Sequence, residues 1–182
     1  IILLTSFNPG SGKTFLTMNI AATLALKGKR LLVIDGDLRR GSTSAYVGTP
    51  HQGLSNYLAG KVQRIEEVIV PASETVRFDV LPVGTIPPNP SELLAGERLQ
   101  PLLVELRTRY DYILIDCPPI ELVADTHILA KYADRTIFVI RAGLLERSML
   151  NELQNIYTEQ KFPNMAMILN GTEGNGSYRY GY

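Results

Sequence analysis

The sequence predicts an α/β fold built on a doubly wound, mostly parallel sheet flanked by helices. Two observations lead to this prediction. Short, continuous runs of apolar residues alternate along the chain with amphipathic stretches of helical length, the pattern of a parallel sheet that is buried on both faces. The first apolar run is followed at once by a glycine-rich turn and a helical stretch, and such sheets bind ligands at the carboxyl ends of their strands.

The strands are predicted from apolar runs that are short and end in turn residues or acids. In chain order they fall at residues 1–5, 30–34, 78–81, 112–115, 135–140 and 165–169. No internal repeat interrupts this order, so we expect right-handed crossovers between successive parallel strands.

The helices are predicted between these strands, at residues 14–26, 53–58, 92–94, 97–110, 124–131 and 146–160. The first of them has a basic last turn and a glycine stop, at Lys27 and Gly28, and the second is closed by Gly60. Three prolines exclude a regular element at residues 86–90. Ser91 is the expected N-cap of the helix that follows.

The composition fits one globular domain. The 182 residues suffice for one buried core, and Lys plus Arg equal Asp plus Glu at 18 each, so the overall charge gives no indication of a nucleic-acid partner. The single cysteine, Cys117, excludes an internal disulfide and fits a reducing compartment. No apolar run is long enough to cross a bilayer. Because the chain opens in a strand at Ile1 without a leader, we expect a domain excised from a longer protein.

The turn after the first strand carries the strongest indication of function. It reads Ser6-Phe7-Asn8-Pro9-Gly10-Ser11-Gly12-Lys13-Thr14, the layout of a loop that binds nucleoside triphosphates. Gly10 and Gly12 allow backbone N–H groups to surround phosphate oxygens, and the following helix adds its positive dipole end. Lys13 can reach the β- and γ-phosphates, and the Thr14 hydroxyl can bind Mg²⁺. Phe7 departs from the usual pattern, which has a small residue at that position.

Acidic residues end two further predicted strands. Asp35 and Asp37 follow residues 30–34, and Asp116 follows residues 112–115. In a parallel sheet these ends meet the phosphate loop at one edge, where one or two carboxylates beside phosphates suffice for Mg²⁺. Asp116 is the carboxylate expected to bind the metal, directly or through water. A second acid near the γ-phosphate could accept a proton from an incoming nucleophile. The alternative for Asp35 is a turn cap.

Four segments together resemble the bacterial tyrosine kinases of the capsule and exopolysaccharide co-polymerase type, which are unrelated to eukaryotic protein kinases. They are the phosphate loop at residues 9–14, residues 31–40 with the pattern Asp-x-Asp-x-Arg, residues 113–119, and residues 81–94 with Pro-Pro-Asn-Pro. Residues 53–60 resemble a further recurrent stretch of that family. The resemblance spans nearly the whole chain, and the second and fourth segments make it specific.

The resemblance implies a tyrosine kinase that uses ATP and Mg²⁺. The catalytic residues that it implies are Lys13, Asp35, Asp37, Asp116 and Arg39. It does not separate Asp35 from Asp37 as the base for the substrate tyrosine, and it places Mg²⁺ on Thr14, Asp35 and Asp116. The residues expected to contact the nucleotide are Pro9, Gly10, Ser11, Gly12, Lys13, Thr14, Phe15 and Asn170. Asn170 resembles the residue that reads the adenine edge in related ATPases, with a turn role as the alternative.

Three of the nine tyrosines, Tyr178, Tyr180 and Tyr182, lie at every second position of the last five residues. We therefore divide the chain into a kinase domain, residues 1–173, and a flexible tail, residues 174–182, whose Gly and Ser spacers provide reach. The resemblance implies that a neighbouring subunit phosphorylates these tyrosines in trans. The alternative is a strand that adds to a sheet edge. Each phosphate adds roughly −1.5 to −2 charges, so a modified tail is expected to leave an acidic site.

The resemblance also implies partners and a location. It implies a ring-like homo-oligomer in the parent protein, a membrane co-polymerase or activator segment, and a protein-tyrosine phosphatase. The chain would then be a cytoplasmic domain of an inner-membrane protein that regulates polysaccharide synthesis and export.

Two other functions stay open. One is an ATPase of the type that partitions plasmids or positions division sites, whose signature lysine early in the loop is replaced here by Asn8. The other is a nucleotide-binding regulator that controls a membrane partner without phosphorylating it. Phosphotyrosine in the tail would distinguish the kinase from both.

Overall fold

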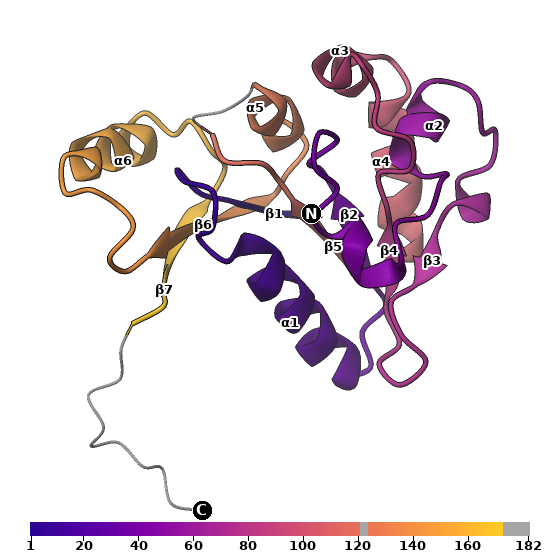
Figure 1. Cartoon of the computed structure of the whole chain (residues 1–182), viewed down its shortest axis with the longest axis horizontal. Coiled ribbons are helices and arrows are strands. Elements are labelled where there is room, and N and C mark those ends of the chain that lie inside the picture. Colours follow the sequence, from indigo (N-terminus) through magenta and orange to yellow (C-terminus); the bar gives the residue numbers. More distant parts are fainter. Residues whose placement is uncertain (121–123, 173–182) are drawn as a thin grey trace, which may run out of the picture.

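The computed structural model describes residues 1–120 and 124–172, which form a seven-stranded sheet with helices on both faces (Figure 1). The strands lie in the order β3-β4-β2-β5-β1-β6-β7. Their bounds are β1 Ile2–Thr5, β2 Leu31–Asp35, β3 Val70–Pro71, β4 Asp79–Leu81, β5 Tyr112–Asp116, β6 Arg135–Arg141 and β7 Met165–Asn170. Neighbouring strands pair in parallel except β3 and β4, which are antiparallel. The predicted doubly wound, mostly parallel fold is confirmed.

The helices lie where they were predicted, with ends that differ by a few residues. They are α1 Lys13–Leu26, α2 Leu54–Leu58, α3 Pro90–Ala95, α4 Leu99–Arg109, α5 Asp125–Ala130 and α6 Met149–Thr158, with short 3₁₀ turns at Ser44–Val47 and Ile65–Glu67. The glycine stop of α1 is confirmed. Gly28 adopts a φ of +76° and donates its N–H to the Ala25 carbonyl, which closes the last turn.

The start of α3 corrects the prediction that Ser91 is its N-cap. The helix begins at Pro90, and the N-cap is Asn89, with φ −130° and ψ 62°. A residue before proline is kept out of the right-handed helical region by a steric clash, whereas the fixed φ of proline suits the first helical position. Ser91 therefore lies inside the first turn, where its hydroxyl donates to Asp125.

Alternate residues of the central strands face two separate cores. On one face, Leu4 and Val33 pack with residues of α1. On the other, Leu3 and Leu32 pack with residues of α4, α5 and α6, and Figure 1 shows α1 on the opposite side of the sheet from these helices. Burial on both faces explains why the strand sequences are continuous apolar runs rather than alternating ones.

The order of the strands brings three chain segments together at one edge of the sheet. β5 lies between β1 and β2, with Asp116 beside both Leu4 and Asp35 in the register. Because all three strands are parallel, their carboxyl ends are adjacent. The loop that leaves β1 after Thr5 therefore emerges beside the acids that end β2 and β5.

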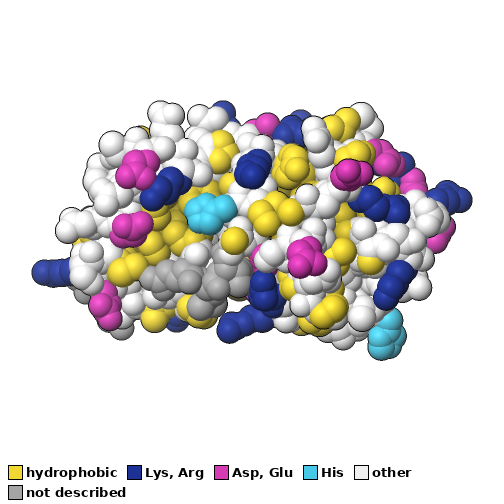
Figure 2. Space-filling model, turned by 90° about the horizontal axis from the view of Figure 1, so that it is seen from above, with side chains coloured by type: hydrophobic (Ala, Val, Ile, Leu, Met, Phe, Trp, Pro, Cys, Tyr) yellow, Lys and Arg dark blue, Asp and Glu magenta, His cyan; other side chains and the backbone are white. Residues whose placement is uncertain are grey.

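The surface carries charges of both signs. On the face drawn in Figure 2, Lys and Arg side chains are interspersed with Asp and Glu. Some of the surface charges are paired, such as Arg107 with Asp134 at 2.8 Å. The absence of a nucleic-acid partner stays a prediction. Within residues 1–120 and 124–172, no helix has the length and apolar character that a membrane span requires.

Candidate nucleotide site

The phosphate loop joins the end of β1 to the start of α1. Gly10 and Gly12 adopt φ values of +75° and +90°, which residues with side chains rarely adopt. A Cβ on Gly12 would lie 2.3 Å from Asn170 Nδ2, so a side chain there would displace the Asn170 amide and strain the backbone. The loop leads into the first turn of α1, whose free N–H groups and positive dipole end attract phosphate.

The structure explains why this loop has a large residue, Phe7, where the usual pattern has a small one. Its ring is only 2% exposed and lies edge-on to Phe138, with 5.1 Å between the ring centroids. The side chain belongs to the core on the face of the sheet that α4, α5 and α6 cover, and it does not line the cavity at the loop. A large residue fits here because it fills the core and leaves the inside of the loop to the backbone.

Lys13 is buried at the base of the loop, with 9% of its surface exposed. Its Nζ donates a hydrogen bond of 3.1 Å to Ser6 Oγ. Burial lowers the pKa of the ammonium group, while the carboxylates of Asp116 and Asp37 act in the opposite direction. A cation with so little water around it is placed to pair with phosphate oxygens that enter the loop.

Asp116 ends β5 with its carboxylate almost fully buried. Oδ2 accepts hydrogen bonds from the hydroxyls of Thr14 at 2.6 Å and Thr43 at 2.8 Å, whereas Oδ1 has no partner among the described residues. Burial raises the pKa of this carboxyl group. A buried acceptor that lacks a partner costs about 1–3 kcal/mol. The position therefore fits a cation, or a water that a cation holds.

The donor set suits Mg²⁺ rather than a metal enclosed by protein ligands. Among residues 1–120 and 124–172, no group of three or more His, Cys, Asp or Glu is arranged to hold a metal ion. Mg²⁺ does not need such a group, because it keeps several waters and takes one or two protein oxygens beside substrate phosphates. The hydroxyl of Thr14 and the carboxylate of Asp116 are oxygens of this kind.

Asp35, which ends β2, and Asp37, two residues further on, lie in different surroundings. Asp35 is fully buried, and its Oδ2 accepts hydrogen bonds of 2.7 Å from both the N–H and the hydroxyl of Ser44. Burial raises its pKa to about 7. Asp37 instead lines the cavity, and its Oδ1 accepts the N–H groups of Arg39 and Arg40, each at 3.2 Å. The structure thus brings Asp37, and not Asp35, to the cavity.

A cavity of about 230 Å³ lies between the loop and these acids. It is lined by Pro9, Gly10, Gly12, Lys13, Thr14, Phe15, Asp37, Arg40, Ser42, Asp116, Cys117 and Pro119. Two of the residues predicted to bind the nucleotide do not line it. Ser11 is buried, and Asn170 donates from Nδ2 to the Ser11 carbonyl at 3.0 Å, so that it braces the loop from β7. The predicted adenine contact of Asn170 stays a prediction.

Arg39, which the resemblance implies as a catalytic residue, does not line the cavity. Its Nε donates to Asp125 Oδ2 at 3.1 Å, and its Nη2 donates to Ser91 Oγ at 3.2 Å. The next residue, Arg40, lines the cavity instead. Adjacent side chains of the turn after Asp37 thus point to different sides, and the sequence has no periodicity there from which to choose between them.

Two contributors to the site were not predicted. Ser42 lines the cavity, and Thr43 donates to Asp116. Arg141 differs, because its place at the end of a strand predicts that it could approach the nucleotide, with a solvated side chain as the alternative. It donates from Nη1 to the Gly10 carbonyl at 2.9 Å. Ser42 and Thr43 lie in an irregular polar loop that offers no such signal.

Cys117 also lines the cavity, but burial raises the pKa of its thiol well above the usual range. A thiol of this kind is a packed side chain and not a nucleophile. The predicted phosphoacceptors Tyr178, Tyr180 and Tyr182 lie outside the described residues, as does the boundary between residues 173 and 174. Their roles stay predictions.

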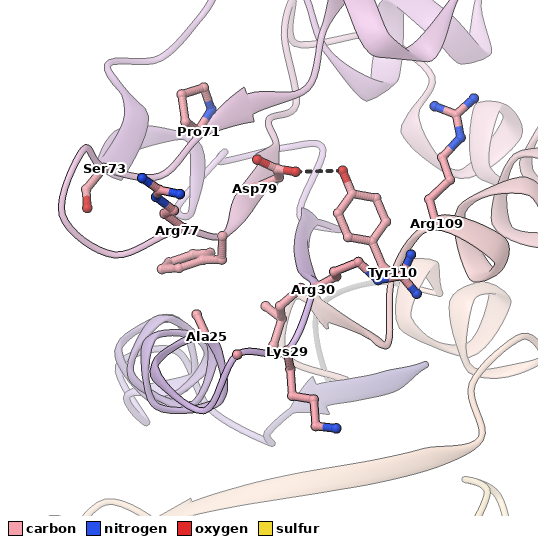
Figure 3. Close-up of a pocket in the computed structure, with 12 residues that line it drawn as sticks. Ala25, Lys29, Arg30, Pro71, Ser73, Arg77, Asp79, Arg109 and Tyr110 are labelled. Carbon is pink, nitrogen blue, oxygen red and sulfur yellow. Dashed lines mark hydrogen bonds between the residues drawn. The ribbon is translucent and has the colours of Figure 1, made fainter.

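A larger cavity, of about 670 Å³, lies at the opposite edge of the sheet (Figure 3). Its walls include the end of α1, the starts of β2 and β4, and the end of α4. The Tyr110 hydroxyl donates to Asp79 Oδ2 at 2.8 Å, while Arg30 and Arg109 are already paired with carboxylates. The carboxyl ends of two helices there disfavour an anion. No residue of the phosphate loop lines this cavity.

The fold and the site together define the class of protein, a P-loop nucleotide-binding domain. A protein-family model described as an AAA domain matches residues 1–167. Tyrosine-protein kinase YwqD of Bacillus subtilis is 35% identical over 182 residues, which cover 100% of this chain and 76% of YwqD. The chain therefore belongs to the AAA-domain family and, within it, to the bacterial tyrosine-protein kinases. The resemblance stated from its motifs is confirmed.

Other similarities agree with this placement. Tyrosine-protein kinase wzc of Salmonella typhimurium is 36% identical over 190 residues, which cover 100% of this chain and 26% of wzc. The kinase domain of the Escherichia coli tyrosine kinase ETK superposes with a TM-score of 0.86 at 36% identity, over 100% of this chain and 71% of that one. The chain thus spans about a quarter of the length of the first curated relatives that it matches.

The division-site ATPases are more distant. The septum site-determining protein MinD of Pyrococcus horikoshii, complexed with Mg-ADP, superposes with a TM-score of 0.72 at 25% identity, over 92% of this chain and 68% of that one. The ATPase alternative therefore shares the fold, but the tyrosine kinases are nearer in both sequence and structure.

Proposed function

We propose that this chain is the catalytic domain of an ATP-dependent protein-tyrosine kinase that phosphorylates tyrosines of its own C-terminal tail. One observation carries the proposal. A single cavity contains a phosphate-binding lysine, Lys13, two groups that suit Mg²⁺, Thr14 and Asp116, and a further carboxylate, Asp37, that neither of those tasks requires. The membership of the chain in a family of tyrosine-protein kinases supports the same assignment.

ATP would bind with its phosphates against the N–H groups of the loop and the Nζ of Lys13. Thr14 and Asp116 would hold Mg²⁺, which when bound neutralises charge on the β- and γ-phosphates. The related MinD fold, complexed with Mg-ADP, supports nucleotide and magnesium use. Since phosphoryl transfer requires mainly positioning and charge stabilisation, these preorganised groups supply most of what the reaction needs from the protein.

Asp37 is the group that we assign as the base. In the reaction the tyrosine oxygen forms a bond to the γ-phosphorus, the bond from that phosphorus to the β–γ bridging oxygen breaks, and ADP leaves. The phenolic proton passes to the carboxylate of Asp37, which lines the cavity. Asp35 is bonded to Ser44 and serves to shape the loop after β2.

The chain covers only about a quarter of the length of the first curated relatives, and this supports a further part of the proposal. We place the domain on the cytoplasmic side of the inner membrane, as part of a longer chain that includes a co-polymerase or activator segment. A ring-like homo-oligomer would present the tail of one subunit to the site of the next. A protein-tyrosine phosphatase would reverse the modification, and polysaccharide synthesis and export would respond to it.

The test is to incubate the purified chain with ATP and Mg²⁺ and to map phosphate by intact-mass and peptide mass spectrometry. We expect phosphate on Tyr178, Tyr180 or Tyr182, and none in the variant Lys13→Met. ADP release without phosphotyrosine would favour the ATPase alternative. Binding of ATP with neither product would favour a nucleotide-binding regulator.

A further inference from the structure

We propose that Asp125 is a positioning residue for phosphoryl transfer, because through Arg39 it holds the turn that carries Asp37. This inference rests on the proposed kinase function. Asp125 lies in the first turn of α5 and is fully buried. Arg39 donates to its Oδ2 at 3.1 Å, and the hydroxyl of Ser91 donates to its Oδ1. Three segments that are remote in the sequence therefore meet at one carboxylate.

The turn that begins at Asp37 behaves as one hydrogen-bonded unit. Asp37 Oδ1 accepts the N–H groups of Arg39 and Arg40, each at 3.2 Å. The Asp37 carbonyl accepts the N–H groups of Arg40 at 3.2 Å and Gly41 at 2.9 Å. Because the carboxylate is bonded to the turn that it starts, an anchor on Arg39 also fixes the direction of the Asp37 side chain.

The anchor itself is a rigid part of the molecule. Asp125 and Ser91 occupy the first turns of α5 and α3, which pack against each other. Arg39 contacts both, at Asp125 through Nε and at Ser91 through Nη2. A guanidinium that is held at two of its nitrogens has a defined orientation, unlike a single point charge.

Stability alone does not account for this ion pair. The Arg39 side chain is 43% exposed whereas that of Asp125 is not exposed at all, and a buried carboxylate loses its hydration when it folds. Replacing both partners of such a pair by apolar residues is often neutral for stability, although removing one partner leaves an uncompensated buried charge. The pair therefore offers a way to separate a positioning role from a structural one.

The phosphate loop does not share these contacts. Lys13 donates to Ser6 and Thr14 donates to Asp116, so these hydrogen bonds do not involve the pair of Arg39 and Asp125. Loss of the anchor should therefore alter transfer to tyrosine while ATP binding stays intact. A lower kcat with an unchanged KM for ATP is a result that a purely structural role would not produce.

The experiment compares the wild-type chain with Arg39→Met, Asp125→Leu and the double variant, using Arg107→Met as a control that breaks the exposed ion pair to Asp134. Both single variants should melt at lower temperature and should phosphorylate the tail about tenfold more slowly or worse, since small misplacements of reacting groups can cost up to about 100-fold. The double variant should recover its melting temperature but not its rate. KM for ATP should stay within about twofold throughout, and the control should keep the wild-type rate.

Arg39→Lys supplies a second test, because it keeps the charge and loses the guanidinium geometry. We expect a rate between those of the wild type and Arg39→Met. A double variant with the wild-type rate would overturn the proposal and assign the pair to stability. A rise in KM for ATP at unchanged kcat would overturn it by placing Arg39 on the phosphates. If the wild-type chain itself forms no phosphotyrosine, the proposed kinase function fails, which is a different result.

Discussion

The hydroxyl of Thr14 donates a hydrogen bond of 2.6 Å to Asp116 Oδ2, across 102 positions of the sequence. Thr43 donates to the same oxygen at 2.8 Å. The first turn of α1, the loop after β2 and the end of β5 are thus joined at one carboxylate oxygen. The groups that suit Mg²⁺ are held in place by the protein itself, so ligand binding need not order them.

Asp116→Asn should separate stability from metal use. The amide keeps the shape of the side chain and removes a buried negative charge. Burial disfavours that charge, as the raised pKa of the Asp116 carboxyl group indicates. We therefore expect a melting temperature no lower than that of the wild type. Mg²⁺ should then no longer strengthen ADP binding, and tail phosphorylation should fall by about 100-fold or more. Calorimetric melting and ADP titrations with and without Mg²⁺ measure these effects. A large drop in melting temperature would show instead that folding depends on the carboxylate.

Lys13→Met should remove catalysis and leave the fold intact. The phosphoryl group in transfer loses its cation, so we expect phosphorylation to slow by about 100- to 1000-fold. The hydrogen bond to Ser6 that is also lost contributes about 1 kcal/mol to stability. Quenched-flow kinetics with labelled ATP and urea unfolding give the two values. An unchanged rate would assign the phosphate cation elsewhere, with Arg40 as the next candidate in the cavity.

Phe7→Ala should destabilise the domain, although it introduces the small residue that is usual at this position of such loops. Phe7 is buried against Phe138, and truncating a buried phenylalanine costs about 3–5 kcal/mol. Phe15→Ala is the matched control, because Phe15 is 59% exposed and its loss should cost less than about 0.5 kcal/mol. Urea unfolding compares them, and equal costs would contradict the placement of Phe7 in the core.

Asp134→Asn should change the acid sensitivity of the fold. Hydrogen bonds from Arg107 lower the pKa of Asp134 from its usual value near 3.8 to about 2. A lowered pKa means that the ionised form stabilises the folded state above about pH 4, and that this contribution disappears as the pH falls towards about 2. The side chain is 53% exposed, so screening limits the contribution to less than about 1 kcal/mol.

The measurement is the free energy of unfolding of both proteins in urea, at several values between pH 7 and pH 3. The wild type should be slightly more stable at pH 7, and the difference should shrink as the pH falls. Added salt should reduce the difference at pH 7 in the same way. A difference that grows in acid would contradict the assignment.

The central strands could be predicted from the sequence because burial on both faces leaves a continuous apolar run, as in β2 and β5. β3 could not. It has two residues, Val70–Pro71, and it pairs antiparallel to β4 at the edge of the sheet. A strand this short has no periodicity, and a proline normally argues against one, so only the tertiary pairing of Val70 with Val80 defines it.

The rule that parallel strands end at one edge predicted that Asp35 and Asp116 would lie together, and they are register partners. It could not decide between Asp35 and Asp37, because the hydrogen bonds of one turn determine which carboxylate reaches the cavity. Nor could it decide between Arg39 and Arg40, since that choice depends on Asp125, 86 positions further along the chain.

The place of β5 between β1 and β2 has a consequence for synthesis of the chain. A nascent chain that leaves the ribosome carries the phosphate loop early, yet the strand that separates β1 from β2 arrives only with Tyr112. Until that strand inserts, the loop has neither its neighbouring acid nor the sheet that supports it, so ATP cannot assist the first stages of folding. Nucleotide binding by a growing chain would therefore report that β5 has inserted between β1 and β2.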